Sequence, residues 1–472
     1  MPKQKQKSPE TFIVWSDEVV SRLDPFFYRP VFKKLIASIN DTEHEAIPLG
    51  DIVEFSVAGD WGEDPNTFEP NPDYTLCNVL RNTNFDNKYN LNFDDVAQRY
   101  VRNDKVEKLA LQKGEILIEK SGGSPVQPVG RVAFVEELPF ENPVVFSNFL
   151  QKIKIADDGF LPEYVFTYLQ AIYHLGYTEF LQNQTTGIKN LRLDDFFNIK
   201  IIKLPKTEQK KVAKFAFDMR EKAKRLELQA LETLDSVDDY VLGELGIATE
   251  RERERVSDAA QIWQIWSDVI ERRLDPMYFH PERMRAIESI KKSNLPISQL
   301  SEVVNFRREI VSEIPENLPY VGLENIISNS GEYVETGEKE SVSSAFVFKK
   351  GDVLFPKLRP YLNKVFYADF DGVCSTEFHV LEAQKCSPFF LFSFLSRSVV
   401  VEQTSRLMTG NTLPRLQTDD VKELLVPIPK EEKQEKITSG VRSYYEKMRN
   451  LREEATSILS GAQAQVEQMI LA

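Results

Sequence analysis

The sequence predicts an α+β protein with two mixed α/β globular domains joined by two long antiparallel helices. Three observations predict this fold: a repeat that spans most of the chain, short apolar runs between turn residues, and two long helical stripes. The 472 residues suggest two to four domains at roughly 150 residues each. Because the repeat occurs twice, we expect the fold to have pseudo-two-fold symmetry.

The repeat is an internal duplication. Eight of the sixteen positions from Trp15 to Pro30 are identical in residues 266–281. Further matches are 113–117 with 350–354, 186–187 with 409–410, and 204–206 with 428–430. The offset falls from 251 to 223, so the first half carries extra residues, mostly between Ile47 and Lys113. A unit of about 200 residues is too long for a solenoid repeat.

Each copy begins with a mixed globular part. Apolar runs bounded by Gly, Pro, Asn and Asp predict strands at residues 115–118, 129–135 and 345–348. Helical patterns occur at residues 162–173 and 388–396. The paired motifs Trp15–Ser16–Asp17 and Trp266–Ser267–Asp268 are interpreted as structural, with each tryptophan packed at a domain entrance.

Each copy ends in a long helix with one apolar stripe. The apolar residues are spaced by a mean of 3.67 residues over 212–245 and 3.56 over 437–469. A stripe of this length must be covered, and the duplication supplies a partner of equal length. We therefore predict a nearly straight antiparallel helix pair, with Gly243 and Gly246 ending the first helix. The predicted boundaries are a first globular domain at 11–205, a spacer helix at 206–246, a linker at 247–261, a second globular domain at 262–430 and a second spacer helix at 431–472.

Composition excludes several classes of protein. Three cysteines without a CxxC pair, and four histidines, argue against a disulfide framework and against a metal site. The chain has no apolar run long enough to span a membrane and no secretory signal, so we expect it in the cytoplasm. The net charge of −14 argues against a nucleic-acid binder. However, three segments carry most of it: residues 41–80 (−10), 231–250 (−6) and 311–340 (−6), which leaves +8 elsewhere.

Several motifs together resemble the specificity (S) subunit of type I DNA restriction–modification systems. They are KGEILIEKSGG at 113–123 with VGRVAFV at 129–135, KGDVLFPKLRP at 350–360, the late Thr–Gly pairs, and the helix junctions at 202–215 and 426–437. The resemblance covers nearly the whole chain. It implies two target-recognition domains, each reading half of a split double-stranded DNA sequence. It also implies that the two helices act as a ruler and dock two methyltransferase (modification) subunits.

The resemblance further implies a restriction/translocase subunit in the full complex and no chemistry in this chain. S-adenosylmethionine, ATP and Mg²⁺ would belong to the partner subunits, and this chain would hold no cofactor. One departure is that Leu358–Arg359–Pro360 replaces the glycine-rich Ser121–Gly122–Gly123. The alternative function is an acidic protein–protein scaffold whose duplicated domains bind protein without DNA specificity.

Candidate DNA contacts are basic and polar residues in loops at matched places in both copies. In the first copy they are Lys120, Ser121, Gly122, Gly123 and Arg131, and later Thr186, Gly187, Lys189 and Arg192. In the second copy they are Lys357, Arg359, Tyr361, Asn363 and Lys364, and later Thr409, Asn411 and Arg415. The alternative interpretation is ordinary turns with solvated charges.

Two patterns suggest catalysis but are interpreted otherwise. Residues 71–74 (Asn–Pro–Asp–Tyr) resemble the Asn–Pro–Pro–Tyr motif of amino-methyltransferases, but no glycine-rich cofactor loop precedes them. Glu115, Glu119 and Lys120 are spaced like part of a nuclease site, yet their apolar surroundings favour an ordinary strand. The sequence therefore predicts that this chain is not an enzyme.

Overall fold

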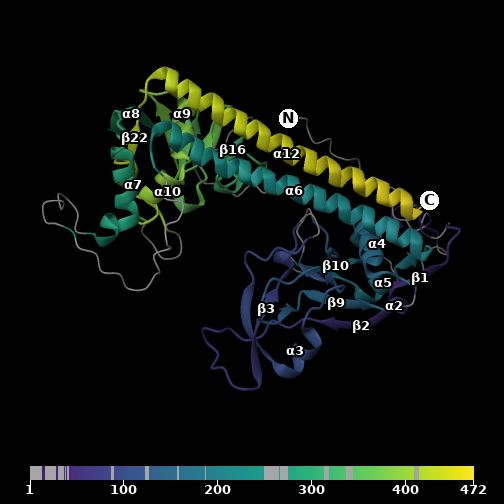
Figure 1. Ribbon diagram of the computed structural model, residues 1–472. Coiled ribbons are helices and arrows are strands. Elements are labelled where there is room, and N and C mark those ends of the chain that lie inside the picture. Colours follow the sequence, from purple (N-terminus) through teal and green to yellow (C-terminus); the bar gives the residue numbers. More distant parts are fainter. Residues whose placement is uncertain are drawn as a thin grey trace. The chain divides into compact units, whose positions relative to one another are not determined.

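The structure is a computed structural model that describes residues 13–15, 28–29, 37, 39, 42–86, 90–122, 127–156, 159–185, 188–248, 265, 275–312, 318–335, 344–408 and 414–471. The chain forms two compact units (Figure 1). Unit 1 holds Met1–Lys224 and Ala455–Ala472, and unit 2 holds Arg225–Glu454. Each of the two long helices therefore contributes one part to each unit.

Unit 1 is built on a four-stranded antiparallel sheet in the order β2-β9-β5-β7. Three smaller sheets have the orders β4-β3-β8, β10-β11-β6 and β1-β12. The strands are β1 (Ala46–Pro48), β2 (Val53–Ala58), β3 (Tyr74–Leu80), β4 (Ala97–Arg102), β5 (Ile116–Glu119), β6 (Ser121–Gly122), β7 (Val132–Phe134), β8 (Val144–Phe146), β9 (Leu150–Ile155), β10 (Gln182–Thr185), β11 (Ile188–Leu191) and β12 (Lys200–Ile202). The helices are α2 (Leu49–Ile52), η2 (Asn82–Asn84), α3 (Asn103–Leu109), α4 (Pro162–His174), η3 (Tyr177–Leu181) and α5 (Leu193–Phe197), followed by α6 (Lys206–Leu245).

Unit 2 repeats the four-stranded sheet in the order β14-β21-β18-β19. Two further sheets have the orders β15-β17-β20-β16 and β13-β22. The strands are β13 (Ile297–Gln299), β14 (Val304–Arg307), β15 (Ile310–Val311), β16 (Tyr320–Val321), β17 (Ala345–Phe348), β18 (Val353–Pro356), β19 (Phe366–Tyr367), β20 (Gly372–Ser375), β21 (Phe378–Ala383) and β22 (Leu425–Pro427). The helices are η5 (Pro276–Phe279), α7 (Pro281–Lys291), α8 (Leu300–Val303), η6 (Leu323–Asn325), η7 (Pro360–Leu362), α9 (Pro388–Leu395), α10 (Ser398–Thr404), α11 (Thr418–Lys422) and α12 (Glu431–Leu471).

The apolar residues of the strands and of one short helix make the core of each unit. In unit 1, Tyr164 and Phe166 of α4 are fully buried with the strand residue Ile118 and with Val212 of α6. In unit 2, α9 buries Phe390 and Phe394 in the corresponding core. Both short helices begin with the proline that favours the first helical turn. The mixed α+β class predicted from the apolar runs is confirmed.

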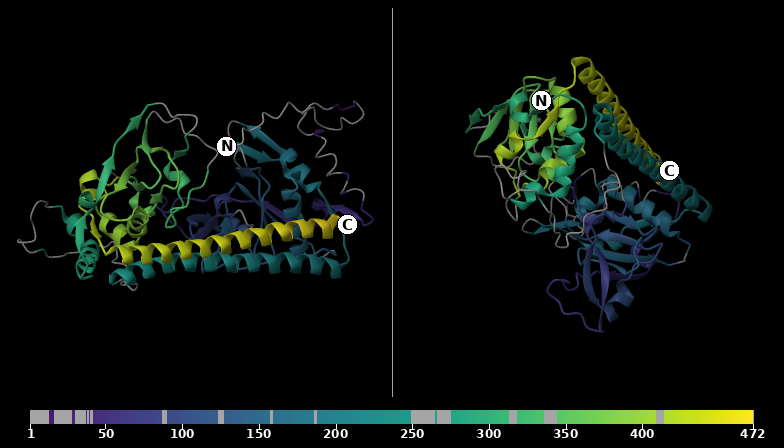
Figure 2. Two further views of the ribbon diagram at one scale, coloured as in Figure 1. Left: turned by 90° about the horizontal axis from the view of Figure 1, so that it is seen from above. Right: turned by 60° about the vertical axis from the view of Figure 1, so that its left-hand side comes forward.

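The long helices α6 and α12 lie side by side in opposite directions (Figure 2). In unit 1, Val212 of α6 shares a core with Ile470 of α12. In unit 2, Val241 of α6 shares a core with Ile437 of α12, and Lys436 pairs with Glu244 at 2.8 Å. The start of each helix therefore meets the end of the other, which confirms the predicted antiparallel pair.

The beginning of each long helix is held by a buried glutamine. Gln209 Nε2 donates to the carbonyls of Gly159 and Leu204, and its Oε1 accepts from the amide of Leu161. Gln434 Nε2 donates to the carbonyl of Pro429, and its Oε1 accepts from the amide of Ser387. This glutamine is part of the helix junction in both copies of the repeat, and it ties each helix to its globular part.

The end of α6 is a Schellman turn. Gly246 has a φ of +67°, its amide donates to Gly243, and the amide of Ile247 donates to Leu242. The predicted end at Gly246 is therefore confirmed, while Gly243 lies within the helix.

The expected packing of the repeated tryptophan is wrong for Trp15, which is 66% exposed. Residues 266–268 lie outside the described residues. In the described part of the chain, no helix is long and apolar enough to cross a membrane.

Candidate nucleic-acid interface

Two segments that the sequence singled out lie next to each other in unit 1. Strand β6 pairs with β11, so that Ser121 lies opposite Asn190 and Gly122 lies opposite Lys189. The amide of Leu191 donates to the carbonyl of Lys120 at 2.8 Å. Ser121 Oγ also donates to Asn190 Oδ1 at 2.7 Å. We call the paired segments 120–122 and 188–192 the loop junction of unit 1.

The same pairing occurs in unit 2. Leu358 forms an antiparallel bridge with Arg415, and the amide of Leu416 donates to the carbonyl of Lys357 at 2.9 Å. The amide of Arg359 donates to Pro414 at 3.0 Å. The paired segments 357–364 and 414–416 are the loop junction of unit 2. In each unit, two candidate segments that are far apart in sequence thus form one surface.

Both loop junctions contain a residue with positive φ at the same place. In unit 1 it is Gly122, with φ +129°, where an added Cβ would lie 2.4 Å from Asn82 Nδ2. In unit 2 it is Arg359, with φ +48° and ψ +55°. This left-handed conformation costs a non-glycine residue roughly 1–2 kcal/mol. Because the Arg359 side chain is exposed, packing does not explain why an arginine stands there.

Two cations expected to contact DNA, Arg131 and Lys364, hold turns inside the units. Arg131 is 8% exposed, and its Nε and Nη2 donate to the fully buried Glu119 at 2.8 and 2.9 Å. Its Nη2 also donates to the carbonyl of Asn82, which starts the short turn η2. Lys364 Nζ makes the equivalent contact in unit 2 with the carbonyl of Leu323, which starts η6. The expectation of DNA contact is therefore corrected for Arg131, which is buried against Glu119. Lys364 is half-buried and uses one N–H donor in this contact, so its contact with DNA stays a prediction.

Three more candidates lie at the base of the loop junctions. Asn363 is 6% exposed and donates to Asn329 Oδ1 and to the carbonyl of Ser396, so its expected DNA contact is also corrected. Lys357 Nζ donates to the carbonyl of Thr376 at 2.7 Å. Burial lowers the pKa of both Lys120 and Lys357. Both lysines are half-buried at the base of the loop junctions.

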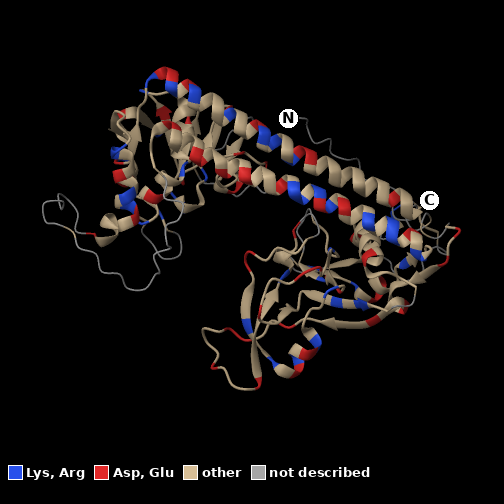
Figure 3. Ribbon diagram, viewed as in Figure 1, with Lys and Arg blue, Asp and Glu red and all other residues tan. Residues whose placement is uncertain are grey.

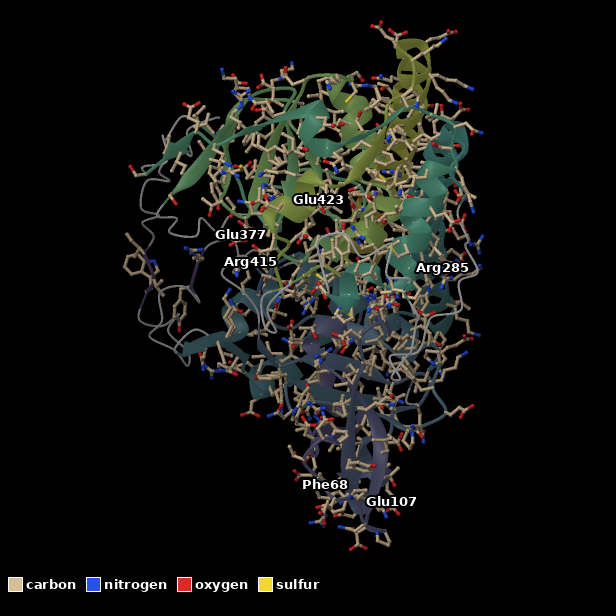
Figure 4. The ribbon with its side chains drawn as sticks, turned by 90° about the vertical axis from the view of Figure 1, so that its left-hand side faces the viewer. Phe68, Glu107, Arg285, Glu377, Arg415 and Glu423 are labelled. Carbon is tan, nitrogen blue, oxygen red and sulfur yellow. The ribbon has the colours of Figure 1, made fainter. Side chains whose placement is uncertain are left out.

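The remaining candidates reach the surface. Arg359 and Tyr361 are exposed, Lys189 is half-buried, and Arg192 pairs with Asp195 at 2.8 Å. Arg415 meets Glu377 through two nitrogens, with Nη2–Oε1 at 2.8 Å and Nε–Oε2 at 3.0 Å. Figure 4 labels this pair and shows the two side chains turned toward each other. In unit 2, the two exposed guanidinium groups of Arg359 and Arg415 can contact phosphates or guanine edges.

A protein-family model now gives the family. The model described as "Type I restriction modification DNA specificity domain" matches residues 42–234 and 296–458, one region in each copy of the repeat. The chain belongs to this family. The two matched regions account for the internal duplication, and the resemblance drawn from the motifs is confirmed.

Individual relatives are more distant. The type I restriction enzyme EcoDI specificity subunit of Escherichia coli is 25% identical over 178 residues, which are 35% of this chain and 40% of that relative. A solved S subunit from M. genitalium is 14% identical, with a TM-score of 0.39, covering 91% of this chain and 97% of that chain. A structure titled for complex assembly and conformational transition of the type I R-M system is 13% identical, with a TM-score of 0.43 and the same coverage. The family assignment therefore rests on the family model.

Specificity subunits are not enzymes, and the residues that suggested catalysis have structural roles here. Glu115 pairs with Lys152 at 3.1 Å, and Glu119 pairs with Arg131. Asn71 accepts from the amide of Asp73, which makes residues 71–74 an ordinary turn before β3. Among the described residues, no three His, Cys, Asp or Glu side chains gather in a way that could hold a metal.

Five candidate residues of this specificity protein lie outside the described residues. They are Gly123, Thr186, Gly187, Thr409 and Asn411. Their contact with DNA stays a prediction.

The sequence did not single out Phe149 and Glu377, which lie at equivalent places beside the two loop junctions. The carbonyl of Phe149 accepts from the amide of Lys120, and the carbonyl of Glu377 accepts from the amide of Lys357. Phe149 is 39% exposed, and the carboxylate of Glu377 pairs with Arg415. No local motif marks either residue, so only strand pairing reveals them.

Proposed function

We propose that this chain is the DNA-reading subunit of a type I restriction–modification complex, and that each unit reads one half of a split target. The proposal rests on the loop junctions. They form at the matched place in both units, and they present Lys189 and Arg192 in one unit and Arg359 and Arg415 in the other. A DNA-contacting surface that occurs once in each unit suits a target with two half-sites.

The two long helices would set the distance between the half-sites. With 40 and 41 residues, α6 and α12 are each about 60 Å long. Half-sites on one face of DNA lie about 34–36 Å apart when they are one turn apart. A helix pair of this length can span that separation, so we propose that it acts as a ruler.

The ruler is tested by lengthening both helices together. Seven residues are inserted between Lys224 and Arg225, and seven between Ser457 and Ile458, which adds roughly 10 Å. The preferred spacer should lengthen by roughly three base pairs in a binding assay against duplexes with graded spacers. A chain with only one insertion is the control and should bind poorly at every spacer. An unchanged spacer preference in the double insertion would contradict the ruler.

The partners of the proposed complex are two methyltransferase subunits, with a restriction/translocase subunit in the complete enzyme. S-adenosylmethionine, ATP and Mg²⁺ would act in those subunits. Residues 231–245 of the acidic segment 231–250 lie in the second half of α6, where the ribbon in Figure 3 carries the red of Asp and Glu. We propose that this acidic surface faces protein rather than DNA.

The net charge of −14 also favours a second candidate, a protein–protein scaffold without DNA specificity. Filter binding of a specific and a scrambled duplex, with and without the methyltransferase subunits, separates the two. Selective binding that strengthens when the methyltransferase is added supports the DNA reader. Equal retention of both duplexes in every mixture would favour the scaffold.

A further inference from the structure

The pair formed by Arg415 and Glu377 lies where the two segments of the unit 2 loop junction meet. Its side chains are 44% and 27% exposed, so both can be reached from solvent. The pair joins residues 38 positions apart, on two separate turns. It is therefore a feature of the assembled surface rather than of a single loop.

The backbone on both sides of this pair is fixed. Arg415 is held through its bridge with Leu358, and the carbonyl of Glu377 accepts from the amide of Lys357 at 2.7 Å. The amide of Glu377 also donates to Ser375 Oγ at 3.2 Å. Lys357 further anchors the turn because its Nζ donates to Thr376. Two charged side chains thus project from a rigid base, which limits the entropy lost when they bind.

The two side chains present donors directly beside acceptors. A guanidinium donates to O6 and N7 of guanine, and a carboxylate accepts from N4 of cytosine. In a G·C pair, guanine O6 and cytosine N4 are neighbours on the major-groove edge. An arginine and a glutamate in contact therefore match one G·C pair, with guanine on the arginine side. In the reversed pair the carboxylate would face guanine O6, and two acceptors would repel each other.

We propose, on the basis of the proposed DNA-reading function, that Arg415 and Glu377 together read one G·C pair in the half-site of unit 2. In the free protein, each side chain satisfies the other. On DNA, part of this bonding is exchanged for bonds to guanine and cytosine. Glu377 is then a specificity residue that rejects other pairs, and Arg415 supplies the contact that binds.

Unit 1 provides the internal comparison. Phe149 stands at the place of Glu377, and Asn190 stands at the place of Arg415. Unit 1 has no Arg–Glu pair at these two positions, so it should read a different base pair there. A change to Arg415 or Glu377 should therefore alter one half-site only.

The experiment selects bound duplexes from a randomised pool, using the full chain assembled with its methyltransferase subunits. The variants are Arg415→Ala, Arg415→Lys and Glu377→Gln, with Asp419→Asn as a control that removes one charge from another exposed ion pair of unit 2. Thermal unfolding checks that each variant is folded. The wild-type selection supplies both half-sites, and so tests the proposed function in the same experiment.

Arg415→Ala should lose roughly 5- to 100-fold of the preference for G·C at one position, while the other half-site stays unchanged. Arg415→Lys should keep most of the overall affinity but weaken this preference, since lysine lacks the rigid planar fork of the guanidinium. Glu377→Gln should admit other base pairs at the same position. A uniform loss of affinity with an unchanged motif would overturn the proposal, because it would make the pair a phosphate contact. A wild-type selection that yields no motif would instead overturn the proposed function itself.

Discussion

The two units share their internal contacts and differ at the surface of the loop junction. Inside, Arg131 and Lys364 hold equivalent turns, and Gln209 and Gln434 hold equivalent helix starts. At the surface, Gly122, Asn190 and Phe149 of unit 1 stand where unit 2 has Arg359, Arg415 and Glu377. The comparison teaches that contacts kept in both copies support the fold. Positions that differ on a shared scaffold are the ones that can give two different readings.

The largest expected effect on stability comes from breaking the buried ion pair of unit 1, between Arg131 and Glu119. Arg131→Met leaves Glu119, which is fully buried, without its ion-pair partner. Leaving one charge of a buried pair uncompensated costs about 3–5 kcal/mol. Hydrogen exchange read by peptide mass spectrometry should show this loss in the peptides of unit 1 and not in those of unit 2.

Lys364→Met is the matched variant in unit 2. Lys364 contacts a carbonyl rather than a carboxylate, so its removal should cost only about 1–2 kcal/mol. Equal losses in the two variants would show that the buried charge of Glu119 does not distinguish the units. A loss of DNA binding without a loss of stability would contradict the structural role of both residues.

Arg131 and Lys364 show which features the sequence could predict and which it could not. Periodicity predicted both long helices, because a single apolar stripe has a direct geometric meaning. The repeat also predicted which loop segments matter, and strand pairing brings them together in each unit. Yet Arg131 and Lys364 look like DNA contacts in sequence. Their interior partners include carbonyls of turns 49 and 41 residues away, a distance that local patterns do not cover.

Glu377 was missed for the same physical reason. It lies on a third segment, between β20 and β21, and meets Arg415 only once the sheets have formed. Asn363 was instead predicted to contact DNA because it is polar and lies in a loop. It is buried, and its side chain bonds to Asn329 and Ser396. Burial of polar side chains depends on packing between distant segments, so composition alone does not reveal it.

Unit 2 has a buried histidine, His379, where unit 1 has a glutamine, Gln151. His379 lies opposite Phe355 in the sheet of unit 2, and Gln151 lies opposite Ile118 in unit 1. Burial, together with the nearby cations Lys357, Arg308 and Lys422, lowers the pKa of His379 from 6.5 to about 3. The unfolded chain therefore binds more protons than the folded chain between these values. Stability is full above pH 6.5 and falls as the pH drops below it.

His379→Gln makes unit 2 resemble unit 1 and removes this proton linkage. Between pH 6.5 and about 4.5, wild-type unit 2 should lose roughly 2–3 kcal/mol more than the variant. Urea unfolding at a series of pH values, followed by hydrogen exchange in peptides of unit 2, measures the difference. Parallel pH profiles for the two proteins would show that His379 does not titrate in this way.

The smallest effect on stability is expected for Arg359→Gly, which tests directly whether the two loop junctions differ in their contact with DNA. Arg359→Gly places in unit 2 the residue type that unit 1 has at the equivalent position, where φ is also positive. Relief of the left-handed strain is partly offset by the greater freedom of glycine in the unfolded chain, so stability should change by at most about 1 kcal/mol. DNA affinity should nevertheless fall, and the slope of its salt dependence should decrease by about one, as for the loss of a single phosphate contact. Gly122→Ala is the reciprocal variant: its Cβ would meet Asn82, so it should destabilise unit 1 by more than about 1 kcal/mol. If Arg359→Gly leaves affinity and salt slope unchanged, the exposed arginine does not serve DNA, and the difference between the two loop junctions at this position is not a difference in reading.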